Sequence, residues 1–154
     1  VFFYRWPDNG CYKDSGDRLI EELENILNEN TQIQKVTLIG HSYGGILVSH
    51  VLNNWKNSVL LDAHLIASPL QGNTSLNTLC GYKPSINLKP MVSLYEWRTQ
   101  QHLDSAFKDL PENPQNIYIE GSIVNVLPDT YNGHRLGHNW SISWVAERIL
   151  KQSS

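Results

Sequence analysis

One serine in this chain has the surroundings that a nucleophile needs. Ser42 is the central residue of Gly40-His41-Ser42-Tyr43-Gly44, a G-x-S-x-G sequence. The apolar run KVTLI precedes it, and apolar residues at helical spacing follow it. This context predicts a tight strand-to-helix turn that lifts the Ser42 hydroxyl above a sheet and leaves no room for a Cβ at Gly40 or Gly44. The backbone N–H of Tyr43, at the positive end of the helix, is expected to be an oxyanion donor.

The elements expected around this serine alternate between strands and helices. Apolar, aromatic and β-branched runs predict four strands, at 1–6, 35–39, 59–67 and 116–120. Helical spacing predicts four helices, from residue 15 or 17 to about 29, and at about 44–55, 99–110 and 140–151. A turn is expected at 7–10, and a loop or small cap at about 70–95. The pattern predicts one α/β domain over 1–154, with a mostly parallel sheet of about four strands and flanking helices.

The run VTLIGHSYGGILVSHVL resembles the nucleophile elbow of lipase- and esterase-like α/β hydrolases. VFFYRWPDNG with the helix after it resembles the strand and helix ahead of that elbow, and LIASPLQGN resembles the strand after it. The resemblance implies a partial α/β-hydrolase fold, the C-terminal portion of a single domain. It also implies hydrolysis of carboxylic (acyl) esters through a Ser, acid, His triad and an acyl-enzyme. The family's second oxyanion N–H comes from a loop ahead of Val1, so we expect the natural protein to extend upstream.

A serine nucleophile needs a histidine that takes its proton and later gives it to the leaving group. The resemblance implies that this base lies after the last strand and before the closing helix. His134 and His138 both lie in that loop. We expect His138 to be the base, because it follows Gly137 and directly precedes the helix, with His134 as the alternative. The other histidines are expected to be packed or exposed imidazoles: His41, His50, His64 and His102.

The acid of the triad is where the sequence departs from the family. The resemblance implies a carboxylate after the next-to-last strand, in a segment like G-x-x-D-x-x-V-P. The matching segment, GSIVNVLPD, has Asn125 in place of that acid. Because Asp129 is the only carboxylate between Gly121 and His138, we expect Asp129 to be the acid, with Asn125 or a distant acid as alternatives. A triad with Asn in place of Asp loses about 10⁴ in turnover.

Composition excludes several other classes of function. The net charge is −3 and the 12 Lys and Arg residues are scattered, which argues against nucleic-acid binding. No Gly-rich phosphate loop or Walker lysine is present, and no apolar run approaches the roughly 18 residues of a membrane span. The resemblance implies a small-molecule ester or lipid substrate, and we expect no cofactor and no metal. The alternatives are a thioesterase, an acyltransferase or a non-catalytic hydrolase-like binding domain.

The two cysteines, Cys11 and Cys80, are far apart in the sequence and lack the spacing of a metal site. Two free thiols are expected in preference to a disulfide. The expected location is the cytoplasm, although the cysteines themselves do not decide the compartment.

Overall fold

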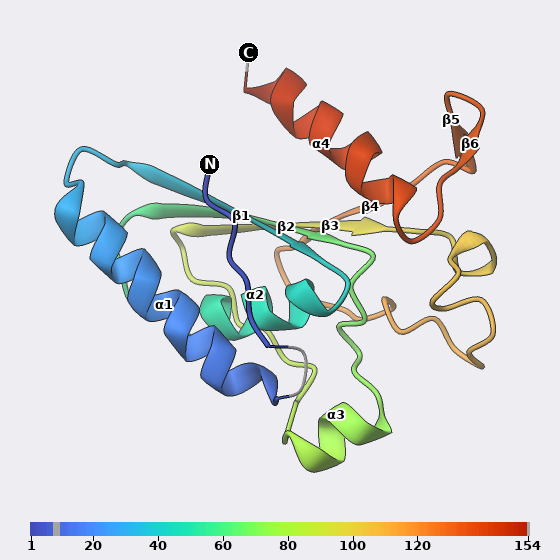
Figure 1. Ribbon diagram of the computed structural model, residues 1–154, viewed down its shortest axis with the longest axis horizontal. Helices are drawn as coiled ribbons and strands as arrows, with labels where there is room; N and C mark the ends of the chain where they lie inside the picture. Colours follow the sequence, from blue (N-terminus) through green and yellow to red (C-terminus); the bar gives the residue numbers. More distant parts are fainter. Residues whose placement is uncertain (8–9, 154) are drawn as a thin grey trace.

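A four-stranded parallel sheet forms the centre of the molecule in the computed structural model, which describes residues 1–7 and 10–153 (Figure 1). Its strands lie side by side in chain order, and all three neighbouring pairs are parallel. They are β1 (Lys35–His41), β2 (Leu60–Ile66), β3 (Val92–Arg98) and β4 (Ile123–Val126). The expected α/β fold with a parallel sheet of about four strands is confirmed.

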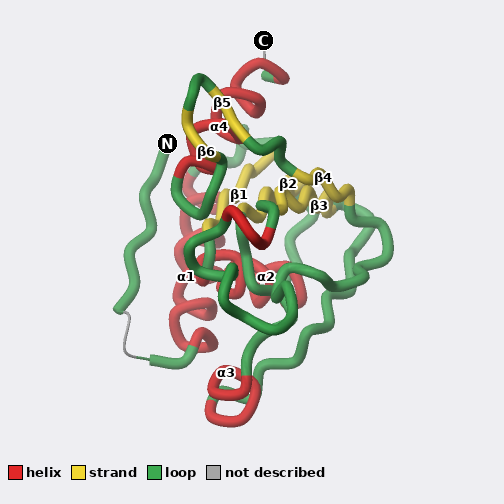
Figure 2. Tube along the Cα trace, turned by 90° about the vertical axis from the view of Figure 1, so that its right-hand side faces the viewer, coloured by secondary structure: helices red, strands yellow, loops and turns green. Residues whose placement is uncertain are grey.

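Helices cover both faces of this sheet (Figure 1). Helices α1 (Tyr12–Glu29) and α2 (Tyr43–Asn54) lie on one face, and α4 (Trp140–Gln152) lies on the other. The short helix α3 (Thr74–Leu79) lies beyond α2, and a small hairpin of β5 (Thr130–Tyr131) and β6 (His134–Arg135) lies beside α4 (Figure 2). Within the part of the chain that the structure describes, no helix is long and apolar enough to span a bilayer.

The core consists of two apolar layers, one on each side of the sheet. Leu19, Leu23 and Leu27 recur every four residues on α1, and all three are buried in the layer that contains α2. Helix α2 is sandwiched between α1 and the sheet, so apolar residues such as Leu52 are fully buried. Ile66 belongs to the second layer, which lies beneath α4. The C-terminal ends of β1 and β2 are therefore held firmly where the candidate nucleophile follows.

Two of the four expected strands are wrong. Residues 1–6 form no strand, because among the described residues they have no neighbouring strand to complete their hydrogen bonds. Residues 116–120 also form none, because Ile123–Val126 takes the position beside β3. Strand β3 itself was expected to be largely loop. It contains the buried carboxylate of Glu96, which Arg98 and Ser122 satisfy with hydrogen bonds.

The helix expected at 99–110 is also wrong. Only a short 3₁₀ helix, η1 (Gln101–Leu103), forms there, followed by turns. The side chain of Asp104 accepts a hydrogen bond from the backbone N–H of Ala106 at 2.9 Å. Such local side-chain bonds compete with helical backbone bonds, which accounts for the irregular path.

Cys11 and Cys80 form a disulfide, with their Cα atoms 5.3 Å apart, so the expectation of free thiols is wrong. The bond joins the residue before α1 to the residue after α3. It therefore fixes α3, in the segment expected to be a loop or small cap, against the start of the domain. The turn expected at 7–10 lies partly outside the described residues, which do not include Asp8 and Asn9.

Candidate active site

Ser42 occupies the turn between β1 and α2, at the C-terminal edge of the sheet. Its φ of 53° and ψ of −123° lie in a region that non-glycine residues rarely adopt. A hydrogen bond of 2.9 Å from the Ser42 N–H to the Ile66 carbonyl holds this backbone in place. Strain of this kind is typical of functional sites, and here it presents a serine side chain at the end of a strand.

Glycines permit the close approach of strand and helix at this turn. A Cβ at Gly40 would lie 2.7 Å from the carbonyl oxygen of Gly44, so the expected need for glycine at position 40 is confirmed. A Cβ at Gly44 would meet only the edge of Trp6, at 3.4 Å, which is an ordinary contact. The crowded helix position is instead Gly45, where a Cβ would lie 2.0 Å from the Ser68 hydroxyl.

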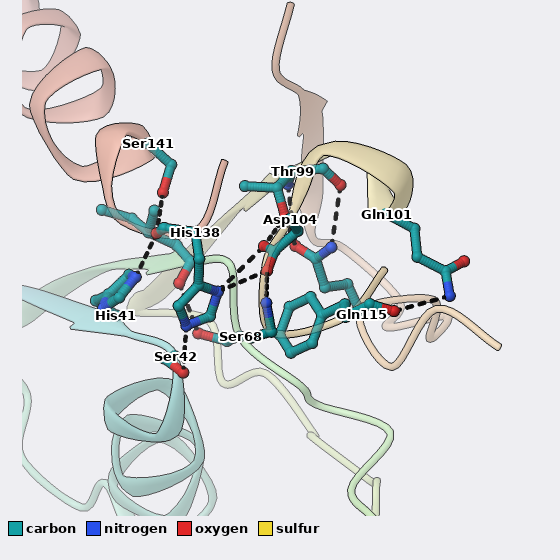
Figure 3. Close-up of polar contacts among 12 residues, drawn as sticks. His41, Ser42, Ser68, Thr99, Gln101, Asp104, Gln115, His138 and Ser141 are labelled. Atoms are coloured by element: carbon teal, nitrogen blue, oxygen red, sulfur yellow. Dashed lines mark hydrogen bonds and ion pairs between the residues drawn. The ribbon is translucent and has the colours of Figure 1, made fainter. Parts of the chain in front are cut away.

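The structure brings Ser42 and His138 together. His138 lies in the loop before α4, and its Nε2 is 2.9 Å from the Ser42 Oγ (Figure 3). Gly137 allows this loop to approach its neighbour, because a Cβ there would lie 2.6 Å from the Leu103 carbonyl oxygen. The alternative base, His134, instead stacks on Trp140 with ring centroids 3.8 Å apart.

The carboxylate beside His138 is Asp104. Its two oxygens lie 3.0 and 3.1 Å from the His138 Nδ1, and the side chain is completely buried. Placing Asp129 beside the imidazole was wrong: its carboxylate accepts a hydrogen bond from Gln100 at the surface. Asp129 precedes the β5–β6 hairpin, which leads the chain away before it returns to His138. Asn125 lies within β4, where it is paired with Trp97 of β3.

The acid follows a strand, β3, that was expected to be largely loop. The resemblance implies an acid after the next-to-last strand; the next-to-last strand of the sheet is β3, and Asp104 follows it. The expectation at residues 121–129 instead followed from the likeness of that segment to the family's G-x-x-D-x-x-V-P. The sequence signal for β3 is the alternation of apolar Val92 and Leu94 with polar Ser93, which the structure buries and exposes in turn.

Buried hydrogen bonds hold the Asp104 carboxylate in position. Thr99 Oγ1 donates to it at 2.5 Å, and the Ala106 N–H donates at 2.9 Å. The buried amide of Gln115 in turn binds both the N–H and the carbonyl of Thr99, each at 3.0 Å. Sequence reasoning did not identify Thr99 or Gln115, since neither lies in a recognisable motif.

These contacts determine the charge of the site. Burial alone would raise the pKa of Asp104, but hydrogen bonds from His138, Thr99 and Ala106 outweigh it and hold the pKa below its usual value. An ionised Asp104 only accepts hydrogen bonds, so His138 carries its proton on Nδ1. Its Nε2 is then free to accept the proton of the Ser42 hydroxyl. The arrangement is that of a nucleophile, a general base and a carboxylate that orients the base.

His41 and Tyr43 lie on either side of the nucleophile in sequence. His41 was expected to be a packed or exposed imidazole, but its Nε2–H donates to the His138 carbonyl at 2.7 Å. Tyr43 is the first residue of α2, where a backbone N–H has no partner within the helix. The remaining histidines are not at the site: His50 pairs with Asp17, His64 with Trp97, and His102 is exposed.

A hollow of about 430 Å³ lies beside Tyr43. Its lining is mainly apolar and includes Trp6, Leu76, Leu79 and Cys80 of the disulfide. Among the described residues, no cluster of His, Cys, Asp and Glu could hold a metal ion.

Comparisons with known proteins add no assignment to this geometry. No family model matches the chain, and no curated protein or solved structure matches it significantly. What the chain can do is therefore inferred from Ser42, His138, Asp104 and their surroundings.

Proposed function

We propose that this chain is a serine hydrolase of the α/β-hydrolase type that cleaves carboxylic esters. Ser42 is the nucleophile, His138 the general base and Asp104 the acid. One observation carries the proposal: a continuous set of hydrogen bonds runs from the Ser42 hydroxyl through His138 to the buried Asp104, at 2.9 and 3.0 Å. The strained strand-to-helix turn and the chain order Ser, acid, His support the same assignment.

The first half of the reaction transfers the acyl group to the enzyme. The Ser42 Oγ attacks the ester carbonyl carbon while its proton passes to the His138 Nε2. Asp104 stabilises the imidazolium that forms. The tetrahedral intermediate then collapses, and the His138 proton goes to the oxygen of the departing alcohol. The products of this half-reaction are the free alcohol and an ester of Ser42.

Water completes the reaction by the same steps. His138 takes a proton from water, whose oxygen attacks the acyl-enzyme carbonyl, and the proton returns to the Ser42 Oγ as the carboxylic acid leaves. In both halves the developing oxyanion lies next to the start of α2. The Tyr43 N–H and the positive end of that helix stabilise it there.

The substrate is an ester with an apolar acyl or alcohol group. The hollow beside Tyr43 has a volume within the range of small-molecule sites, and its lining is mainly apolar. Hydrolysis of a thioester and transfer of the acyl group to an alcohol both proceed through the same acyl-enzyme. A thioesterase or an acyltransferase is therefore included in the proposal. Asn125 was one of two reasons to consider a non-catalytic binding domain, the other being the missing oxyanion loop. The first reason is lost, because Asp104 lies beside His138.

Labelling with a small fluorophosphonate tests the proposal, because this probe reacts only with an activated serine. The wild-type chain is expected to label, whereas Ser42→Ala is not. Ser68→Ala is the matched control, because the Ser68 hydroxyl is buried and bonded to the Ile66 carbonyl. It is expected to label like the wild type. Equal labelling of the wild type and Ser42→Ala would refute the proposal.

A further inference from the structure

The backbone carbonyl of His138 is bound from two sides. The His41 Nε2–H donates to it at 2.7 Å, and the Ser141 hydroxyl donates at 2.8 Å. Figure 3 shows both contacts ending on the same oxygen. Ser141 is fully buried in the first turn of α4, and His41 is the last residue of β1. The residue that bears the proposed base is therefore fixed to the residue directly before the nucleophile.

The His41 ring also packs against the base itself. Its centroid is 4.7 Å from that of His138, with the two planes inclined by 55°. Phe107 contacts the His138 ring edge-on at 5.1 Å. The imidazole is thus confined by rings as well as by the hydrogen bonds to Ser42 and Asp104.

We propose that His41 is a positioning residue, which sets the distance between Ser42 and His138 by holding the His138 carbonyl. This inference rests on the proposed function, since it assigns a role within the same site. Ser42 and His138 are 96 residues apart in sequence, and β1 and the loop before α4 are separate segments. The hydrogen bond from the side chain of His41 to the His138 carbonyl joins these two segments, so that they move as one unit. A displacement of about 1 Å in such a pair can cost about 10² in rate.

A neutral donor suits this place. The charged and titratable groups that face His41 are His138 and Asp104. Burial lowers the pKa of His41, and this effect outweighs the opposing bond to the His138 carbonyl. His41 therefore donates through Nε2 without adding a positive charge beside the imidazolium that His138 becomes during the reaction.

Three substitutions separate this role from simple packing. His41→Gln places an amide donor near the position of Nε2, whereas the shorter His41→Asn places its donor near the position of Nδ1 and falls short of the carbonyl. His41→Phe keeps an aromatic ring against His138 but has no donor. His50→Gln is the matched control, because His50 is a half-buried histidine of α2 that pairs with Asp17, away from the site.

The measurements are kcat and KM for a small p-nitrophenyl ester, with amide hydrogen exchange over residues 134–141. For His41→Asn and His41→Phe, kcat is expected to fall 10- to 100-fold with KM within about twofold, and exchange in the loop to become faster. His41→Gln is expected to retain at least about a third of wild-type kcat and the wild-type exchange. His50→Gln is expected to match the wild type in both readouts.

Either of two kinetic results would overturn the inference: equal behaviour of the Gln and Asn variants, or a rise in KM with kcat unchanged. The exchange comparison does not depend on activity. If the wild type neither labels with fluorophosphonate nor hydrolyses the ester, the proposed function fails, while the exchange rates still decide whether His41 holds the loop. Unchanged exchange in both His41→Asn and His41→Phe would then refute the inference as well.

Discussion

A carboxylate beside a catalytic imidazole fixes the tautomer of the ring and stabilises its positive charge. Asp104 is suited to both tasks, because it is fully buried and receives hydrogen bonds from Thr99, Ala106 and His138. Removing its charge while keeping its shape should therefore affect turnover far more than folding. The same substitution at Asp129 changes a surface group that contacts Gln100.

We expect Asp104→Asn to lower kcat for ester hydrolysis by about 10⁴, because the amide disfavours the required tautomer and provides no charge for the imidazolium. Asp129→Asn should leave kcat unchanged. Steady-state kinetics of the two purified variants, each checked for a wild-type circular dichroism spectrum, makes the comparison. A loss at Asp129 as large as that at Asp104 would show that the acid has been misassigned here.

The sequence predicted those site residues that nearby residues identify, and missed those that depend on distant parts of the chain. Ser42 lies in a five-residue motif with a strand before it and a helix after it, so neighbouring residues suffice to find it. His138 requires only the loop before the last helix. Identifying Asp104 depends on knowing which strands the sheet contains, and β3 pairs with β2 and with β4, each more than twenty residues away in the sequence. The role of His41 has no local signal, because its partner is a backbone carbonyl 97 residues away.

At the scale of elements, the crossing of α2 over β2 depends on Gly45. A Cβ at Gly45 would lie 2.0 Å from the Ser68 hydroxyl oxygen, whereas a Cβ at Gly44 would lie 3.4 Å from the edge of the Trp6 ring. Both glycines lie in the same helical turn, so the gain in helix propensity on substitution by alanine is similar, up to about 1 kcal/mol. A difference between them therefore measures the steric contact alone.

We expect Gly45→Ala to lower the free energy of unfolding by about 1–3 kcal/mol, the usual cost of overpacking a tight contact. Gly44→Ala should be neutral or slightly stabilising. Urea denaturation of both variants provides the values. Adding Ser68→Gly removes the two atoms that would lie within 3 Å of an alanine Cβ at position 45, and should restore most of the loss in a double-mutant cycle. Additive effects of the Gly45 and Ser68 substitutions would contradict the steric explanation.

Element patterns also explain which parts of the fold were predictable. β1, α1, α2, β2 and α4 have long apolar periodicity, and each was expected close to its observed position. β3 and β4 are short or contain polar residues such as Glu96, whose burial depends on the distant partner Ser122. Residues 1–6 have the composition of a strand but no strand beside them among the described residues. A strand forms only where a neighbouring strand pairs with it, so the composition of a single segment does not predict it.

At the scale of the whole molecule, the Cys11–Cys80 disulfide closes a loop with a sequence separation of 69. Because disulfides persist in oxidising compartments, it opposes the expectation of a cytoplasmic location, and we propose an oxidising compartment instead.

A disulfide that closes a loop of this length should stabilise the fold by about 4 kcal/mol through the entropy of the unfolded chain. Urea denaturation with and without reductant should show a loss of this order, and the Cys11→Ala/Cys80→Ala variant should show no response to reductant. Equal stability of the wild type in both conditions would contradict a native disulfide.

The pH dependence of stability is also a property of the whole fold, because it compares the folded and unfolded chains. Burial lowers the pKa of both His41 and His64 from the ordinary value of 6.5. Below about pH 6.5 the unfolded chain therefore binds protons that the folded chain does not, so the free energy of unfolding must fall as the pH decreases. Each histidine lowers the free energy of unfolding by at most about 1.4 kcal/mol for each pH unit of decrease. Asp104 acts in the same direction only below its ordinary value of 3.8, outside this window.

We accordingly expect the free energy of unfolding to be nearly constant above pH 7 and to decline between pH 6.5 and 5. His41→Gln should make that decline shallower, because an amide does not titrate. His102→Gln, which removes an exposed histidine, should leave the slope as in the wild type. Urea denaturation at pH 7.5, 6.5, 5.8 and 5 measures all three chains. A wild-type stability that stays constant or rises toward pH 5 would mean that His41 and His64 bind protons in the folded chain as readily as in the unfolded one, and that burial does not keep the ring beside the proposed base neutral.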